Sequence, residues 1–162
     1  RLNGIKTRNG NFTARLPDGR NIYLKESAVQ PIMKETMVKP TRILTEARRF
    51  LGVPYLWGGI TPAGFDCSGY IRAVLGRFGI DLARDTKEQI KQGEPIDRNS
   101  IRSGDLVFFP GHVGIAIDHE RLIHASRGGG GVRINSLVTS GDDYRQDLDS
   151  SYLAARRILQ CT

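Results

Sequence analysis

The chain has 162 residues, of which 39% are hydrophobic and 25% are charged, a composition that excludes a disordered protein and suits a globular domain. No apolar run approaches the roughly 18 residues that a membrane-spanning helix needs, so no membrane span is expected. Lys and Arg number 24 against 17 Asp and Glu, which gives a net charge of +7. This charge favours an anionic partner: nucleic acid, an anionic membrane surface or an acidic wall polymer. The competing interpretation is a solvated basic surface without such a partner.

Residues 1–40 read as the end of a small β structure followed by a connector. Turn signals at residues 9–10 and 17–20 separate two strand-like pieces, at residues 11–16 and 21–24. Two hairpins bury too little apolar area to form a core alone, so we interpret the segment as the tail of a β-barrel whose first strands are missing. The first residue is Arg rather than Met, which indicates a trimmed N-terminus and leaves localisation open.

Three helices are predicted in the next fifty residues. Thr41 can cap the first helix, and Gly52 ends it. The second begins at Cys67, after a loop rich in Gly and Pro, and runs to Phe78; the third covers residues 86–92. The apolar face of the first helix comprises Ile43, Leu44, Ala47, Phe50 and Leu51, and that of the second comprises Ile71, Val74, Leu75 and Phe78.

The second half of the chain is strand-like. Strands are predicted at residues 106–109, 113–118, 122–126, 131–134 and 152–158. Because helices come first and strands follow, the fold class is α+β, with N-terminal helices packed on an antiparallel sheet and a partial β segment in front. We place the division at residues 1–40 and 41–162. The four glycines at 128–131 lack the strand-then-helix context of a phosphate-binding loop.

Cys67 is the first candidate for chemistry. It lies in the opening turn of the second helix, where free N–H groups and the helix dipole favour an anion and should lower the pKa of the thiol. Asp66 is a natural N-cap. A single cysteine at a helix start is, however, more often structural. The other cysteine, Cys161, is the penultimate residue, so we expect no disulfide between the two and assign Cys161 no role.

Two of the three histidines lie in adjacent predicted strands. The alternate residues 113, 115 and 117 are apolar and point inward, so His112, Gly114 and Ala116 share the other face of the strand. A two-residue turn would put His124 on the opposite face. A three-residue turn at 118–120 places His124 opposite Gly114, within side-chain reach of His112, and this is the connection we predict. His119 reads as a turn residue.

A cysteine with two histidines is the set that nucleophilic acyl transfer needs. The thiolate attacks a carbonyl, one imidazole moves the proton, and a further polar group fixes the tautomer of that imidazole. A zinc site is the weaker alternative, because no ligand pair is closely spaced and no fourth ligand is evident. The third interpretation is an inert thiol with two buried histidines. We expect neither a metal nor a cofactor.

Five motifs, in order along residues 41–159, carry a resemblance to a known family. They are Phe50-Leu51-Gly52-Val53-Pro54-Tyr55-Leu56-Trp57-Gly58-Gly59, Phe65-Asp66-Cys67-Ser68-Gly69, Gly104-Asp105-Leu106-Val107-Phe108-Phe109, His112-Val113-Gly114-Ile115 and Ile123-His124-Ala125. The set resembles the NlpC family of bacterial cell-wall cysteine endopeptidases. The resemblance implies a papain-like core and cleavage of peptidoglycan stem peptides between D-glutamate and the following diamino acid.

The resemblance also implies roles for individual residues. Cys67 would be the nucleophile, His112 the base and His124 the third member of the triad. Tyr55 would donate its hydroxyl to the oxyanion together with the Cys67 backbone N–H. Trp57, in the same motif as Tyr55, is interpreted as a packing residue.

Residues 14–24 resemble the last hairpin of a bacterial SH3-like domain. Family members with such domains often require a free N-terminal L-alanine on the stem peptide. The resemblance assigns recognition of that end of the substrate to two pairs, Asp66 with Ser68 and Asp85 with Thr86. The competing interpretation is that Asp66 only caps a helix and that Asp85 and Thr86 only begin one.

The expected partners are therefore peptidoglycan stem peptides or muropeptides, and not nucleic acid. The expected location is secreted, periplasmic or wall-associated, with cytoplasmic muropeptide recycling as the alternative. A related thiol amidase or acyltransferase acting on another wall amide, or a wall-binding module, are the rival functions. The sequence leaves open the oligomeric state and the choice between diaminopimelate and lysine.

Overall fold

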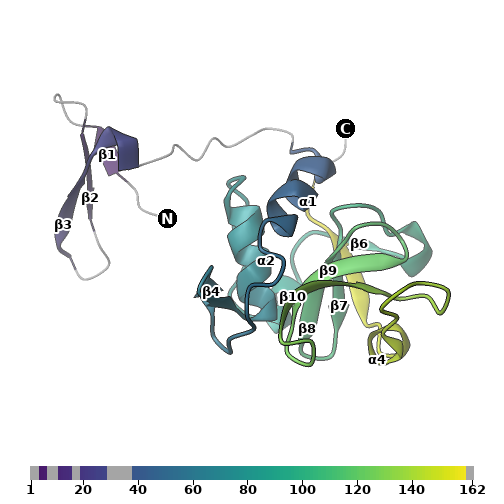
Figure 1. Ribbon diagram of the computed structural model, residues 1–162. Helices are drawn as coiled ribbons and strands as arrows, with labels where there is room; N and C mark the ends of the chain where they lie inside the picture. The colour runs from purple at the N-terminus through teal and green to yellow at the C-terminus, as the bar shows by residue number, and fades with distance from the viewer. Residues whose placement is uncertain (1–3, 7–10, 16–18, 29–37, 160–162) are drawn as a thin grey trace. The chain divides into compact units, whose positions relative to one another are not determined.

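The structure is a computed structural model that describes residues 4–6, 11–15, 19–28 and 38–159, and the chain divides into two compact units, Arg1–Met33 and Lys34–Thr162 (Figure 1). The predicted turn at residues 9–10 and the role of Cys161 lie outside the described residues. Within the described ranges, no helix is both long and apolar enough to cross a membrane.

The smaller unit contains a three-stranded antiparallel sheet in the order β1-β2-β3. Its elements are β1 (Gly4–Lys6), β2 (Phe12–Arg15), β3 (Asn21–Leu24) and the 3-10 turn η1 (Glu26–Ala28). The two strands predicted at residues 11–16 and 21–24 are confirmed. Strand β1 was not predicted.

The larger unit is built on a six-stranded antiparallel sheet in the order β10-β9-β8-β7-β11-β6. Its strands are β6 (Glu94–Ile96), β7 (Leu106–Phe109), β8 (His112–Ala116), β9 (Arg121–Ser126), β10 (Gly131–Ser136) and β11 (Ala154–Arg157). A two-stranded hairpin, β4 (Ile60–Thr61) with β5 (Gly64–Phe65), precedes it. The predicted α+β class with an antiparallel sheet is confirmed.

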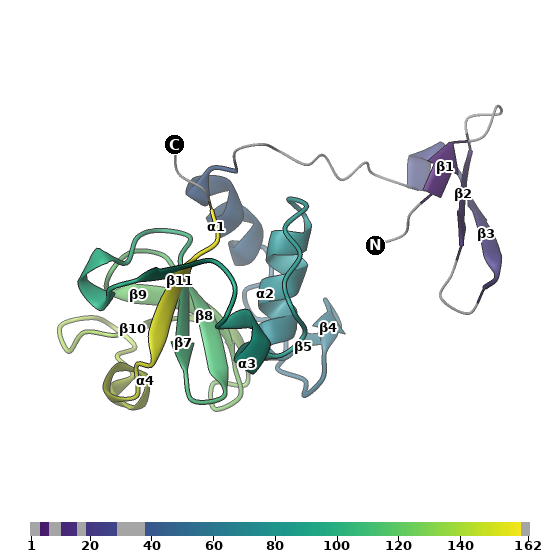
Figure 2. The ribbon, with the colours of Figure 1, turned by 180° about the vertical axis from the view of Figure 1, so that it is seen from behind.

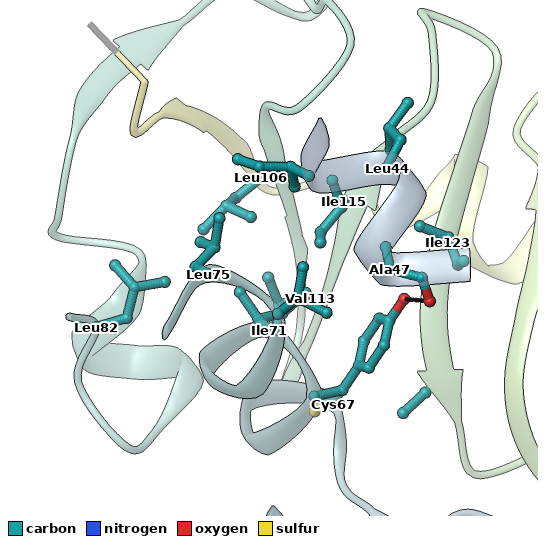
Figure 3. Packing of buried hydrophobic residues seen from close by; sticks show 14 of the residues in the cluster. Leu44, Ala47, Cys67, Ile71, Leu75, Leu82, Leu106, Val113, Ile115 and Ile123 are labelled. Carbon is teal, nitrogen blue, oxygen red and sulfur yellow. Dashed lines mark hydrogen bonds between the residues drawn. The ribbon is translucent and has the colours of Figure 1, made fainter. Parts of the chain in front are cut away.

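Apolar side chains alternate between the two faces of this sheet. Helices α1 (Pro40–Arg48) and α2 (Cys67–Gly76) cover one face (Figure 2). There Ile71 and Leu75 of α2 meet Leu106, Val113 and Ile115 of the strands (Figure 3). The opposite face carries a second apolar cluster, which includes the short helix α4 (Gln146–Ser150). That cluster comprises Ile101, Val107, Phe109, Ala116, Leu122, Leu137, Leu148 and Ala155.

The boundaries of all three predicted helices depart from the sequence prediction, and α2 ends at Gly76 rather than at Phe78. Thr41 is not the cap of α1, because Lys39 occupies the N-cap position and Pro40, whose ring presets a helical φ, opens the helix. Leu51 does not join the apolar face and is 46% exposed. The third predicted helix is shorter than expected and forms α3 (Thr86–Gln89), and a 3-10 turn, η2 (Arg98–Ser100), follows β6.

Candidate active site

Cys67 is the first residue of α2 and is held there by local contacts. The Asp66 carboxylate caps the helix, with its Oδ1 accepting from the Gly69 N–H at 2.6 Å. Gly69 has no room for a side chain, since a Cβ would lie 2.2 Å from the Gly59 carbonyl oxygen. The Cys67 side chain is 7% exposed, and its Sγ lies 3.8 Å from the carbonyl oxygen of Gly111. The helix start therefore presents the thiol to the segment that leads into β8.

The thiol is neutral in the resting protein, contrary to the expectation from the helix dipole alone. Burial raises the pKa of Cys67, and the negative charge of Asp66 raises it further. The backbone N–H groups of Ser68, Val113 and Cys67 itself act in the opposite direction but do not outweigh burial. The predicted lowering of this pKa is thus wrong, because the prediction counted the local helix and not the packing above it. A thiol of this kind needs a base to become a nucleophile.

The register of the β8–β9 hairpin puts both histidines on one face of the sheet. Ile115 pairs with Ile123, and the Ile117 N–H donates to the Arg121 carbonyl at 2.8 Å. Three residues, 118–120, therefore connect the strands, as predicted. Gly114 falls opposite His124, and a Cβ at Gly114 would lie 2.3 Å from Cδ1 of Leu122 and 3.2 Å from the Cβ of His124. The absence of a side chain at Gly114 therefore leaves room for both Leu122 and His124.

The two imidazoles are in direct contact. His112 Nε2 lies 2.6 Å from His124 Nδ1, and the rings meet edge to face. His124 Nε2 lies in turn 2.9 Å from Oδ1 of Asn135 on β10. His124 is 1% exposed. Burial lowers the pKa of His112 to about 3, with His124 adding to the effect, and lowers the pKa of His124 to about 4. Both rings are neutral at neutral pH.

Lowering the pH should destabilise the folded protein, because the two buried imidazoles resist protonation. Their folded pKa values lie below the ordinary 6.5, so between pH 6.5 and about 4 the unfolded chain binds protons that the folded chain does not, and stability falls with the pH. For His124 alone the depression corresponds to roughly 3 kcal/mol. Measured by urea unfolding between pH 7 and 4.5, the free energy of unfolding should fall more steeply with decreasing pH in the native chain than in the His112→Gln/His124→Gln variant. Equal slopes of this free energy against pH would contradict the prediction.

The backbone on either side of His112 lies against the Cys67 thiol, and no hydrogen bond joins the two side chains. The thiol contacts Gly111, and the Val113 N–H also acts on the thiol, so the sulfur lies along the backbone on both sides of His112. Such contacts often tighten only when substrate is bound. Among the described residues, no group of three His, Cys, Asp or Glu side chains is arranged to hold a metal ion.

A pocket opens beside the thiol, with an empty volume of about 430 Å³ including its solvent-exposed mouth. It is lined by Tyr55, Trp57, Gly58, Asp66, Cys67, Ser68, Arg84, Asp85, Thr86 and Gly111. All five residues predicted to bind substrate are in this set. Burial raises the pKa of Tyr55, as do the Cys67 thiol once it is ionised and the Asp66 carboxylate, so the Tyr55 hydroxyl stays a donor. Trp57 is 81% exposed at the pocket, and its interpretation as a packing residue is wrong.

Arg84 is a pocket residue that the sequence interpretation missed. Its guanidinium donates to both carboxylate oxygens of Asp66 and, at 2.9 Å, to the hydroxyl of Ser68. Asp66 also accepts from the backbone N–H groups of Gly58 and Gly69. Burial pushes the pKa of Asp66 upward, but these donors and the Arg84 charge hold it below its ordinary value. The acceptor capacity of Asp66 is therefore largely used inside the protein.

Asp85 and Thr86 reach the pocket at the start of α3. Asp85 occupies the N-cap position, but its side chain caps no N–H group, and the residue is exposed. The segment is held by Gln89, which is fully buried and donates to the carbonyl oxygens of Ser68 and Ala83. Of the two aspartates at the pocket, Asp85 is thus the one whose carboxylate is open to a ligand.

Comparison with known proteins gives consistent matches. The model of the NlpC/P60 family matches residues 52–149. Dipeptidyl-peptidase 6 of Lysinibacillus sphaericus is 35% identical over 91% of this chain and 57% of that protein, and the gamma-D-glutamyl-L-lysine dipeptidyl-peptidase of Bacillus subtilis is 31% identical over 83% and 47%. The chain thus spans about half the length of these relatives. The murein DD-endopeptidase MepS/murein LD-carboxypeptidase of Escherichia coli is 38% identical over 86% and 73%.

Solved structures give the same match. An NlpC/P60 family protein from Bacillus cereus superposes with a TM-score of 0.72 at 28% identity, over 98% of this chain and 54% of that chain. The NlpC/p60 domain of the peptidoglycan hydrolase SagA superposes with a TM-score of 0.62 at 34% identity, over 74% and 99%. These similarities establish the papain-like architecture of the larger unit.

Proposed function

The chain belongs to the NlpC/P60 family, and from that premise we propose that it is a cysteine peptidase that hydrolyses the γ-D-glutamyl–diamino acid bond of peptidoglycan stem peptides. The observation that carries the proposal is the buried thiol at the start of α2, which lies against the backbone flanking His112, a histidine whose Nε2 contacts a second histidine. The name of the Bacillus subtilis relative supports the choice of bond. The net charge of +7 suits an anionic wall polymer.

The reaction would proceed by acyl transfer through Cys67. The scissile carbonyl enters the pocket, His112 takes the thiol proton on Nδ1, and the sulfur attacks the carbonyl carbon. The oxyanion accepts hydrogen bonds from the Cys67 backbone N–H and the Tyr55 hydroxyl. His112 then gives its proton to the leaving amine of the diamino acid. A water molecule, deprotonated by His112, hydrolyses the thioester and restores the thiol.

The test of this proposal is mass spectrometry of the products from defined peptides. L-Ala-γ-D-Glu-diaminopimelate and its lysine analogue should each be offered with free and with N-acetylated amino termini. Release of L-Ala-D-Glu supports γ-glutamyl cleavage. Cleavage of intact peptidoglycan only at the bond between sugar and peptide would instead establish the thiol amidase, and no cleavage of either substrate would reject a hydrolase.

We also propose that the pocket selects a free N-terminal L-alanine, with Asp85 as the principal carboxylate and Asp66, Ser68 and Thr86 completing the site. Asp85 is favoured because Asp66 already accepts hydrogen bonds from Arg84 and two backbone N–H groups. An ammonium at Asp66 would have to share that carboxylate with the guanidinium. Charge-assisted contacts of this kind contribute about 1.5–3 kcal/mol.

Asp85→Asn should raise KM for the free-amine peptide by about tenfold or more, because the charge-assisted contact is lost. Values of kcat and the melting temperature should hardly change, since the side chain caps no N–H group. Asp66→Asn is the matched comparison and should lower thermal stability, because it weakens the helix cap and the Arg84 pair. Equal KM changes for free and N-acetylated peptides would remove Asp85 from amine recognition.

For the smaller unit, we propose that residues 1–40 are the tail of a bacterial SH3-like domain and the linker to a peptidase domain at residues 41–162. The three-stranded antiparallel sheet β1-β2-β3 supports this assignment, because such domains are small antiparallel β structures. The partners and location that follow are stem peptides or muropeptides at the cell wall or in the periplasm.

A further inference from the structure

We propose that Asn135 is a positioning residue that fixes the tautomers of both histidines, through a chain of hydrogen bonds anchored on the backbone carbonyl of Asp143. The inference rests on the proposed function, because it takes His112 as the base. Asn135 lies on β10, is 3% exposed, and contacts His124 on one side and Asp143 on the other.

The contact with Asp143 determines which group donates and which accepts in each of these hydrogen bonds. The Asn135 amide lies with one of its atoms 2.8 Å from the carbonyl oxygen of Asp143 and the other 2.9 Å from Nε2 of His124. A carbonyl oxygen only accepts hydrogen bonds, so the NH₂ group of Asn135 must face it. The amide oxygen of Asn135 must therefore face His124.

The orientation of the Asn135 amide determines which nitrogen is protonated in each of the two imidazoles. The amide oxygen of Asn135 only accepts, so His124 must carry its proton on Nε2. A neutral imidazole has one proton, which leaves Nδ1 of His124 as an acceptor at 2.6 Å from His112 Nε2. His112 must then carry its proton on Nε2. Its Nδ1 keeps a free lone pair, which is the form a base for Cys67 requires.

The anchor itself is held by the backbone. Asp143 adopts a left-handed conformation with φ 55°, the single non-glycine residue to do so in the described part of the chain. Its carbonyl oxygen also accepts from the Ser136 N–H at 3.3 Å, while the Ser136 carbonyl accepts from the Arg145 N–H at 2.9 Å. The loop after β10 is thus tied back onto the strand at the point where it presents this carbonyl to Asn135.

Without Asn135, His124 would lose the acceptor for its Nε2 proton in a buried place. The Nδ1–H tautomer of His124 would then become accessible, and it would donate to His112 Nε2. His112 would in that case carry its own proton on Nδ1 and present no lone pair to the thiol. The remaining charged groups that act on the two rings are Arg133, Arg145 and Asp147. Asp147 is paired with Arg145.

The test combines nitrogen NMR of the imidazole rings with kinetics, on the full chain and on Asn135→Leu, Asn135→Asp and Ile134→Val. Ile134→Val shortens a neighbouring side chain of β10 that packs on the opposite face of the sheet. It should therefore lower stability slightly without changing the hydrogen bonds of Asn135, His124 and His112. Only three histidines are present, and His119→Gln assigns the third signal. Two-bond nitrogen–proton correlations distinguish the tautomers directly.

In the native chain, both His112 and His124 should be Nε2–H tautomers. Asn135→Leu should populate the Nδ1–H form of His124 and lower kcat by about 10²-fold with little change in KM, the lower range for loss of general-base catalysis. Asn135→Asp keeps the acceptor for His124 but loses the donor to the Asp143 carbonyl, so it should keep the Nε2–H tautomers, recover part of the lost kcat and move the titration of His124 to higher pH. Ile134→Val should keep both tautomers and the native kcat.

An Nδ1–H tautomer at His124 in the native chain would overturn the proposal. It would also be overturned if Asn135→Leu kept both Nε2–H tautomers and matched Ile134→Val in kcat. Should Asn135→Leu not fold, the native spectrum and Asn135→Asp decide the outcome. Failure of the proposed function, seen as no turnover of any substrate by the native chain, leaves the tautomer measurement intact and is thereby distinguishable.

Discussion

Replacing Cys67 by alanine is expected to abolish turnover, with a loss of at least about 10⁴-fold, while the protein stays folded. The change removes the one atom that forms the acyl intermediate. The side chain is small and lies at the edge of the core, so the free energy of unfolding should fall by only about 1 kcal/mol. Turnover measured by release of L-Ala-D-Glu, together with urea unfolding, checks both parts.

The second cysteine provides the matched control. Cys161→Ala should keep native activity, because we assign that residue no part in the reaction. Intact-protein mass spectrometry during turnover should reveal an acyl adduct on the native chain and on Cys161→Ala, and none on Cys67→Ala. An adduct that persists in Cys67→Ala, or turnover above about one per cent of native, would mean that another group is the nucleophile.

The fold could be predicted where local pattern and tertiary environment agree. The strand at residues 106–109 was predicted to the residue, because β7 is buried on both faces and reads as a continuous apolar run. The turn length at 118–120 followed from requiring two histidines to share a face. Strand β6 and helix α4 were missed because they are short and mostly exposed. Strand β6 owes its state to pairing with β11, some sixty residues later.

The candidate site could be predicted only in part, for a related reason. Cys67, His112 and His124 stand in recognisable local patterns. Arg84 and Asn135 do not, because each acquires its role from a partner distant in the chain: Asp66 for Arg84, and His124 for Asn135. The error in the Cys67 pKa has the same origin. The helix start is visible in the sequence, but the depth at which packing buries that start is not.

Replacing His112 by alanine should be nearly as severe as losing the thiol, with kcat/KM lowered by about 10³-fold or more at pH 7. Because burial raises the pKa of Cys67, the resting thiol carries its proton and depends on His112 to remove it. Without that base, only the small thiolate fraction can react, and it grows tenfold for each unit of pH below the thiol pKa. The residual rate of His112→Ala should therefore rise with pH at a slope near one on a logarithmic scale. The native rate should stay flat over the same range, because the pKa of His112 is only about 3.

Two further histidine variants test whether the pH profile of His112→Ala reports the loss of the base itself. His124→Ala should be milder, since His112 then keeps its ring but loses its orienting partner. His119→Ala removes an exposed turn histidine and should leave the profile unchanged. If thiolate and imidazolium were instead already present in the resting enzyme, the native rate would not stay flat, but would fall as the imidazolium lost its proton with rising pH. A native rate that falls between pH 6 and 8 would thus contradict the neutral pair, and a flat profile for His112→Ala would show that the thiol loses its proton by another route.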